Sequence, residues 1–305
     1  MRSETVGSKF HFGGYVGPAN SVELRAVPPF DLAQVVRSHG WIALPPFRWD
    51  ESSQTLSTAC ELEGRPAMVS VRETKPNTVA ATWTGLAVES SVADVVNRML
   101  GLSEDLSAFQ QICGRRKRFR HIVERGLGRL LRSSTLWEDA VKVLCTTNIS
   151  WAGTRGMVRR LVDEFGSEAP GGVRCFPGPA TIAEAGAQAL AERAKLGYRA
   201  PHLAEFASAV SDKRVDLRKW EDRRVDSNEV RREILAVKGF GEYAAATIMA
   251  LTGRYDRVPI DTAYMDFVTH RYFGGSRPSR KAAEAVYESW GEWKHLAYWF
   301  ERFAD

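Results

Sequence analysis

A glycine hairpin between two apolar helices, followed by an aspartate, is the feature of this sequence that most limits its possible folds. Residues 232–268 contain two segments of helical periodicity on either side of Gly239-Phe240-Gly241. Asp261 follows directly after Val258-Pro259-Ile260. The proline favours an extended approach to a third helix, with the aspartate in its first turn. The stretch therefore predicts a helix, a glycine hairpin, a second helix, and an acidic residue at the start of a third.

The predicted hairpin suits a phosphate. Glycine accepts backbone conformations that are closed to other residues, and the start of the next helix leaves N–H groups unpaired. Such a hairpin can hold a DNA strand without reading its bases. Taken separately, the glycines are more often a packing turn, and Asp261 is more often an N-cap. The order and spacing of the two features make the pair more specific than either alone.

This combination resembles the helix-hairpin-helix DNA glycosylases, in which a Gly/Pro-rich loop and an essential aspartate follow the hairpin. The resemblance implies that a base is flipped out of duplex DNA and that its N-glycosidic bond is hydrolysed. It assigns the catalytic carboxylate to Asp261 and a phosphate contact to Lys238, Gly239 and Gly241. Members that are also lyases carry a lysine where this chain has Tyr243. Because a phenol cannot form an imine, we expect hydrolysis alone, with Tyr243 beside the sugar or base.

Three further segments are similar to the 8-oxoguanine and alkylbase (3-methyladenine) glycosylases, namely Leu136–Val158, Ala194–Pro201 and Trp290–Arg302. The similarity implies that Asn148 fills the space left by the flipped nucleotide and that Tyr198 wedges beside the lesion, with Arg199 also at the DNA. A hydrogen bond at a helix end explains Asn148 equally well. A half-buried aromatic at a helix start, with Arg199 paired to an acid, is the alternative for Tyr198. Members that recognise the opposite cytosine carry an arginine at the position of Gly153, so dependence on the opposite base is open.

The base pocket implied by the resemblance contains Thr247, Tyr298 and Arg302, with Trp151 beside them. Oxoguanine enzymes carry a cysteine, a glutamine and a phenylalanine at the first three positions. The replacements are more polar, so we do not expect 8-oxoguanine as the substrate. One alternative is a bulky hypermodified pyrimidine, such as the glucosylated hydroxymethylcytosine of phage DNA, excised as antiviral defence. Another is a protein that binds distorted DNA without any chemistry.

The fold class expected is α+β. Short β-branched or aromatic segments near residues 10–15, 55–61, 67–72 and 78–83, with one helix over 32–39, predict a small antiparallel sheet with a helix. Helical periodicity dominates afterwards. We therefore expect an N-terminal β domain over residues 1–92 and a helical glycosylase domain of two subdomains over 93–305, with the hairpin motif at 227–253.

The formal net charge of +5 agrees with a polyanionic partner without requiring one. The densest basic segment is Arg115–Arg120, and Arg125, Arg129 and Arg132 are expected to continue the same basic face. Such a run is usually a solvated surface. In a DNA-binding protein it would contact phosphates and make the affinity depend on salt.

The cysteines are too scattered to predict a metal site. Cys60, Cys113, Cys145 and Cys175 form no Cys-x-x-Cys pair. We expect buried thiols in a reducing, cytoplasmic setting and no iron–sulfur cluster. A structural monovalent cation at the hairpin is the one cofactor that the resemblance leaves open. No apolar run reaches membrane-spanning length, so no membrane partner is expected. The partner that the resemblance implies is double-stranded DNA, and we expect the protein to be a monomer.

Overall fold

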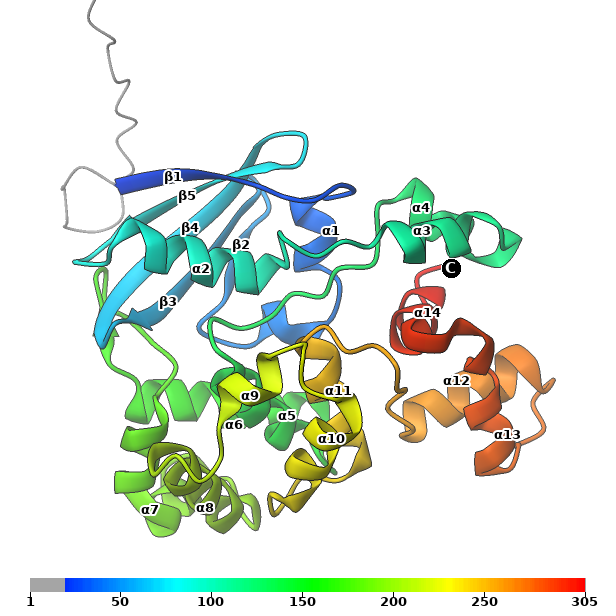
Figure 1. The fold of residues 1–305 in the computed structure, drawn as a ribbon. Coiled ribbons are helices and arrows are strands. Elements are labelled where there is room, and N and C mark those ends of the chain that lie inside the picture. Colours follow the sequence, from blue (N-terminus) through cyan, green and yellow to red (C-terminus); the bar gives the residue numbers. More distant parts are fainter. Residues whose placement is uncertain (1–19, 305) are drawn as a thin grey trace, which may run out of the picture.

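A five-stranded antiparallel sheet forms one end of the molecule (Figure 1). The computed structural model describes residues 20–304. The strand order is β1-β5-β4-β3-β2. The strands are β1 (Asn20–Arg25), β2 (Arg48–Asp50), β3 (Thr55–Leu62), β4 (Arg65–Lys75) and β5 (Thr78–Thr84). The strands expected near 55–61, 67–72 and 78–83 are confirmed, whereas the one expected at 10–15 lies outside the described residues.

Short helices and one long helix cover the sheet. They are α1 (Leu32–Val36), the 3-10 helix η1 (Gly40–Ala43) and α2 (Glu89–Leu100). A separate small hairpin, made of β6 (Glu168–Ala169) and β7 (Val173–Arg174), lies against β3. The helix expected over 32–39 is therefore shorter, because the chain turns into η1. The expected domain boundary at 92/93 falls inside α2, which packs on β1 and β5. The first helix after the strands thus belongs to the sheet layer.

One group of helices shares a hydrophobic core with the sheet. Its members are α5 (Leu136–Thr146), α6 (Trp151–Phe165), α7 (Pro179–Glu192), α8 (Arg199–Ser211), α9 (Leu217–Glu221), α10 (Ser227–Ala236) and α11 (Glu242–Leu251). The helix α11 carries three consecutive buried alanines, Ala244, Ala245 and Ala246. These small side chains let α5 and α10 approach α11 closely. The helix–hairpin–helix expected at 227–253 is confirmed as α10 and α11.

A second group of helices has its own core. It combines α3 (Ser107–Gly114), η2 (Lys117–Phe119) and α4 (Arg120–Glu124) with α12 (Thr262–Tyr272), α13 (Arg280–Ala285), η3 (Glu288–Trp293) and α14 (Lys294–Glu301). Figure 1 shows the α3–α4 segment beside the C-terminal helices. The helical region therefore has two parts, as expected, and the chain passes from the first to the second between α11 and α12. Asp261 lies on this passage.

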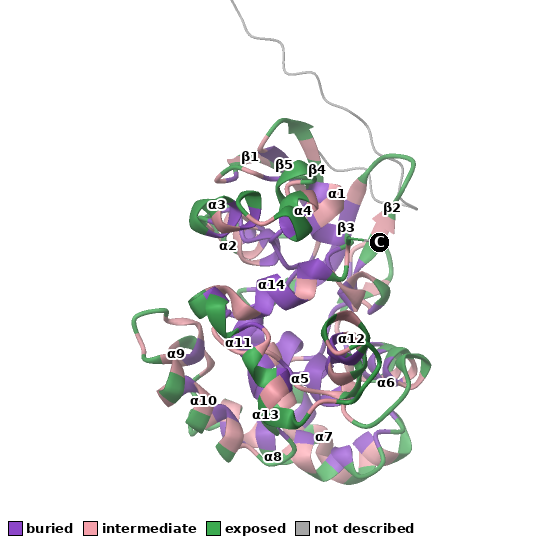
Figure 2. Cartoon of the chain, turned by 90° about the vertical axis from the view of Figure 1, so that its right-hand side faces the viewer, coloured by how far each residue is buried: buried purple, intermediate pink, exposed green. Residues whose placement is uncertain are grey.

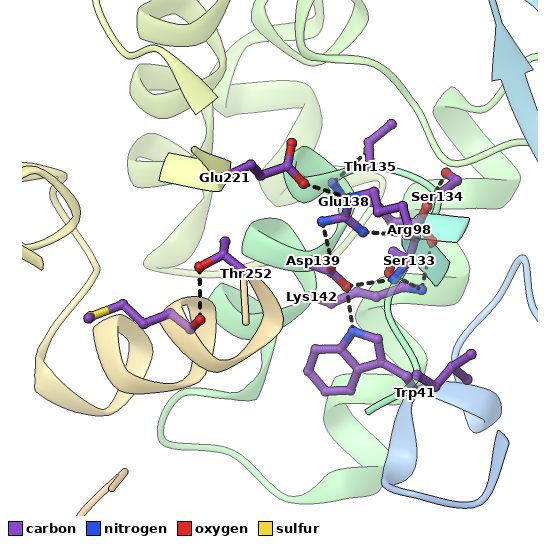
Figure 3. A network of polar contacts seen from close by, with 12 residues as sticks. Trp41, Arg98, Ser133, Ser134, Thr135, Glu138, Asp139, Lys142, Glu221 and Thr252 are labelled. Carbon is purple, nitrogen blue, oxygen red and sulfur yellow. Dashed lines mark hydrogen bonds and ion pairs between the residues drawn. The ribbon is translucent and has the colours of Figure 1, made fainter. Parts of the chain in front are cut away.

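A buried polar network fixes α5 against the rest of the protein (Figure 3). Asp139 on α5 accepts a hydrogen bond from the indole N–H of Trp41 at 2.7 Å and forms an ion pair with Arg98 of α2 at 2.9 Å. On the same helix Lys142 pairs with Glu138 at 2.6 Å, and both are almost completely buried. Because a buried charge is costly without its partner, these contacts hold η1, α2 and α5 in one arrangement. Figure 2 shows that α5 and α14 lie largely inside the molecule.

Within residues 20–304, none of the helices combines the length and the apolar character needed to cross a lipid bilayer.

Candidate functional site: the hairpin, Asp261 and the ends of α5 and α14

The two hairpin glycines differ in what surrounds them. Gly239 has a φ of +91°, and a Cβ there would lie 3.0 Å from Nδ1 of His202 and 3.1 Å from Cδ1 of Leu144. Gly241 has an ordinary φ of −104°, and its Cβ position faces open space. Neither backbone N–H donates a hydrogen bond to another residue within 20–304. The fold thus requires glycine at 239, whereas Gly241 presents bare backbone outward.

Lys238 extends from the same hairpin into solvent. Its ammonium group lies 3.1 Å from a carboxylate oxygen of Glu205 on α8, and both side chains are well exposed. An exposed pair of this kind contributes little to stability and can be exchanged for a phosphate. The position of Lys238 is therefore compatible with the predicted DNA contact.

Asp261 is the N-cap of α12. Its Oδ1 accepts a hydrogen bond from the backbone N–H of Tyr264 at 2.7 Å, which fixes the carboxylate at the helix start. The side chain is half-buried, and no hydrogen bond to Oδ2 occurs within the described residues. The capping interpretation is thus confirmed, but it uses only one of the two oxygens. The second oxygen is left for another partner.

Tyr243 lies in the first turn of α11, close to Asp261. Its hydroxyl is 3.3 Å from Oγ1 of Thr146, the last residue of α5. Burial raises the pKa of Tyr243, and the negative charge of Asp261 raises it further, so the hydroxyl stays protonated. One turn later, Thr247 donates to the carbonyl of Tyr243 at 2.9 Å. Thr146 was not among the residues singled out in the sequence, yet it joins α5 to this site.

The C-terminal helix corrects one pocket prediction. The side chain of Tyr298 is 1% exposed, because the rings of Tyr264, Phe267 and Tyr287 surround it. It therefore lies beneath the surface and does not line an open pocket. This corrects the prediction that Tyr298 belongs to the base pocket. Burial raises its pKa, whereas the nearby Arg302 lowers it and the charge of Asp261 again raises it, which places its hydroxyl in the same electrostatic neighbourhood.

Arg302 is the exposed group of this helix. Its guanidinium lies 4.9 Å from the ring of Trp299 and 5.6 Å from that of Tyr298, and it donates to the Tyr298 hydroxyl at 3.3 Å. No carboxylate lies within 4.0 Å of it in the part of the chain that the structure describes. The half-buried Trp299, which the sequence did not single out, donates its indole N–H to the carbonyl of Ser38 at 2.7 Å. Arg302 thus offers free donors over an aromatic surface.

Trp151, predicted in the base pocket, begins α6 and is 41% exposed. Its six-membered ring rests on Gly40, where an added Cβ would meet it at 2.7 Å. The neighbouring His39 contacts Trp299 edge to face, with ring centroids 6.3 Å apart. Trp151 and Trp299 therefore both lie beside the segment that leads into η1.

The turn between α5 and α6 carries Asn148, which is exposed and has a left-handed φ of 47°. Tyr198 lies just before α8 and is 55% exposed. Arg199, by contrast, is only 4% exposed, so the prediction that it contacts DNA is wrong for this conformation. Among residues 20–304 it pairs with no acid either: it donates to the carbonyl of Thr147, and its guanidinium lies 4.4 Å from the ring of Tyr198. Arg199 therefore positions the turn and Tyr198.

Two of the three arginines predicted to continue the basic face are buried, whereas Arg125 is exposed. Arg129 and Arg132 are 2% and 9% exposed. Arg129 donates to the carbonyl of Glu104 at 2.9 Å, and Arg132 pairs with the Glu104 carboxylate at 2.7 Å. Both arginines hold the loop before α3. They stabilise the fold and are not available to DNA phosphates.

All four cysteines are buried free thiols, as expected. Burial raises the pKa of Cys145 to about 12 and that of Cys175 to about 11, so both stay protonated at neutral pH. In residues 20–304 no three His, Cys, Asp or Glu side chains gather as a metal site. The monovalent cation at the hairpin stays a prediction.

Sequence comparisons return no match, neither to a family model nor to a curated protein. The structure, however, is similar to solved DNA glycosylases. The 3-methyladenine DNA glycosylase from Archaeoglobus fulgidus superposes with a TM-score of 0.77 at 20% identity, over 92% of this chain and 99% of that one. The apo 8-oxoguanine glycosylase/lyase from Clostridium acetobutylicum superposes at 0.75 with 18% identity, over 93% and 96%.

The same Clostridium enzyme bound to double-stranded DNA, with cytosine opposite 8-oxoguanine, superposes at 0.73 with 19% identity, over 92% and 94%. Each match covers nearly the whole of both chains, so the agreement includes the sheet, the hairpin helices and the C-terminal helices. The chain therefore has the fold of the 3-methyladenine and 8-oxoguanine DNA glycosylases.

Proposed function

We propose that the protein is a DNA N-glycosylase that hydrolyses the glycosidic bond of a modified base flipped out of duplex DNA. The observation that carries the proposal is the environment of Asp261. Its carboxylate is fixed through Oδ1, keeps Oδ2 free of hydrogen bonds within residues 20–304, and lies near Tyr243. The solved neighbours that share the fold act on damaged bases by their names, and one holds double-stranded DNA.

The proposed chemistry needs a fixed negative charge. Breaking the bond between C1′ and the base nitrogen leaves positive charge on the deoxyribose, and the bonding electrons leave with the base. The Asp261 carboxylate stabilises that charge and orients a water molecule, whose oxygen bonds to C1′ as its proton is released. The bare N–H groups of Gly239 and Gly241 bind a phosphate nearby. Asn148 and Tyr198 keep the duplex open.

We propose hydrolysis without lyase activity. Tyr243 stands where lyases of this fold carry the imine-forming lysine, and the buried phenol of Tyr243 stays protonated and cannot form an imine. No covalent enzyme–DNA adduct should therefore accumulate when sodium borohydride is added during excision. A trapped adduct would overturn this part of the proposal and leave glycosylase activity intact.

The base excised is proposed to be other than 8-oxoguanine, because Thr247, Tyr298 and Arg302 stand where the oxoguanine enzymes carry a cysteine, a glutamine and a phenylalanine. Arg302 is an exposed donor without a carboxylate partner in the described residues, beside the half-buried Trp299. A donor-only group favours a base or base substituent that presents oxygen acceptors. This observation keeps the hypermodified pyrimidine as the second candidate substrate.

An excision screen tests the proposal. Purified protein is incubated with duplexes that each carry one deaminated, alkylated, oxidised or hypermodified base, and abasic sites are detected by alkaline cleavage. We expect abasic sites in one substrate class and no strand cleavage before alkali. A protein that binds these duplexes tightly and releases no base from any of them would be the non-catalytic binder, which contradicts the proposal.

A further inference from the structure

The turn between α5 and α6 presents an apolar side chain next to Asn148. The turn comprises residues 147–150, and its tip is exposed. Ile149 keeps 40% of its surface exposed. Single exposed apolar side chains are common and need no explanation of their own. Ile149, however, lies next to Asn148, the residue proposed to enter the DNA duplex, so its exposed side chain can contact DNA at the same place.

Ile149 is folded back onto the backbone of Gly153. A Cβ at Gly153 would lie 2.6 Å from both Cγ1 and Cδ1 of Ile149. The isoleucine therefore occupies the space that any side chain at 153 would need. Arg155 does not replace it, because residues two apart on a helix lie on different faces. The space at Gly153 is thus filled by the hydrocarbon of Ile149.

Hydrogen bonds at both ends of the turn fix its position. Arg199 donates to the carbonyl of Thr147 and stacks on Tyr198, and Ser150 caps α6 by accepting from the N–H of Gly153 at 3.3 Å. Because both ends of the turn are fixed, Asn148, Ile149 and Tyr198 form one preorganised surface. A preorganised surface loses little entropy when it enters a duplex.

We propose that Ile149 contacts the base left unpaired on the opposite strand when the target nucleotide is flipped, and that this contact accepts all four bases. The proposal rests on the proposed function. Reading a base edge requires hydrogen-bond donors or acceptors in a fixed pattern. An alkyl group offers every base the same dispersion contact and exclusion of water. The amide of Asn148, the polar neighbour, is assigned to the gap left by the flipped nucleotide and not to the opposite base.

The test measures binding to duplexes that carry a tetrahydrofuran abasic analogue opposite adenine, cytosine, guanine or thymine. No base has to be unpaired in these duplexes, so differences in pairing energy do not enter. We expect the wild-type Kd values to agree within about 3-fold, whereas a bidentate base contact would separate them by about 5- to 150-fold. Ile149→Ala should weaken binding to all four by about 5- to 10-fold, from the apolar area lost.

Val123→Ala is the matched control, because Val123 is 41% exposed and lies on α4, away from this turn. Its affinities should equal those of wild type. A preference above about 3-fold for one opposite base would overturn the proposed indifference. Unchanged affinities in Ile149→Ala would overturn the proposed contact. Failure of the wild type to prefer any abasic duplex over an undamaged one would instead count against the proposed function, on which this inference rests.

Discussion

Replacing the hairpin glycines by alanine one at a time separates what the fold requires from what a DNA strand requires. Gly239 has a left-handed φ of +91°, and its new methyl group would meet His202 and Leu144 at 3.0 and 3.1 Å. Left-handed backbone costs alanine about 1–2 kcal/mol, and crowding the methyl group adds about 1 kcal/mol. Gly239→Ala should therefore lower the free energy of unfolding by about 2–3 kcal/mol.

Gly241→Ala should behave differently. Its φ of −104° and ψ of −169° are accessible to alanine, and no atom lies within 4 Å of the new methyl group. The weaker N-cap and the stiffer unfolded chain each change stability by less than about 1 kcal/mol, with opposite signs. Stability should therefore stay near that of wild type. The methyl group does, however, stand where a phosphate would approach the backbone, so affinity for abasic duplex should fall by about 10-fold.

Urea unfolding followed by circular dichroism gives the stabilities, and fluorescence anisotropy with a labelled abasic duplex at fixed salt gives the affinities. The reasoning is refuted if Gly241→Ala binds DNA like wild type, because its outward backbone would then have no partner. It is equally refuted if Gly241→Ala is destabilised as much as Gly239→Ala.

Three further predictions follow from buried groups. Arg199→Met frees the Thr147 carbonyl, so binding to abasic duplex should weaken in anisotropy measurements; unchanged binding would show that Arg199 does not position the turn. Burial lowers the pKa of His295 from 6.5 to about 4, so the unfolded state binds more protons between these values and stability falls as the pH drops. The pKa of the buried His39 is likewise lowered to about 4, so urea unfolding should show a loss of about 4 kcal/mol between pH 7 and pH 5, of which His295→Asn removes about half. Lys142→Met leaves the buried Glu138 carboxylate without its ion-pair partner and should cost about 3–5 kcal/mol in the same assay, whereas replacing both by apolar residues should cost much less.

The elements around the hairpin could be predicted because their signals are local. Glycine at 239 and 241, the apolar spacing before and after them, and Pro259 each act on neighbouring residues. The strands β2, β6 and β7 were missed because two or three residues are too few to show alternation, and the six-residue β1 was not among the expected segments either. The boundary at 92/93 failed because α2 has helical periodicity but packs on the sheet, which only tertiary contacts reveal.

In the candidate site, too, local signals could be predicted from the sequence, whereas tertiary contacts could not. Asp261, Tyr243 and Asn148 were proposed from spacing and resemblance, and the charge of Asp261 acts on the Tyr243 hydroxyl in the structure. Arg199 was misjudged because its partner is a backbone carbonyl, which leaves no trace in the sequence. Arg129 and Arg132 were misjudged because a basic run does not reveal which of its members meet Glu104. Trp299 could have been considered, since it adjoins a predicted pocket residue.

The most direct test of the central claim is single-turnover excision by Asp261→Asn on the substrate that the screen identifies. Asparagine is as good an N-cap as aspartate, so folding and DNA binding should be retained. Asp266→Asn, an exposed position on the same helix α12, is the matched control. Loss of the fixed charge should slow excision by about 100-fold or more, with an unchanged Kd for DNA and a wild-type rate in the control. Excision by Asp261→Asn at the wild-type rate would contradict the role assigned to this carboxylate.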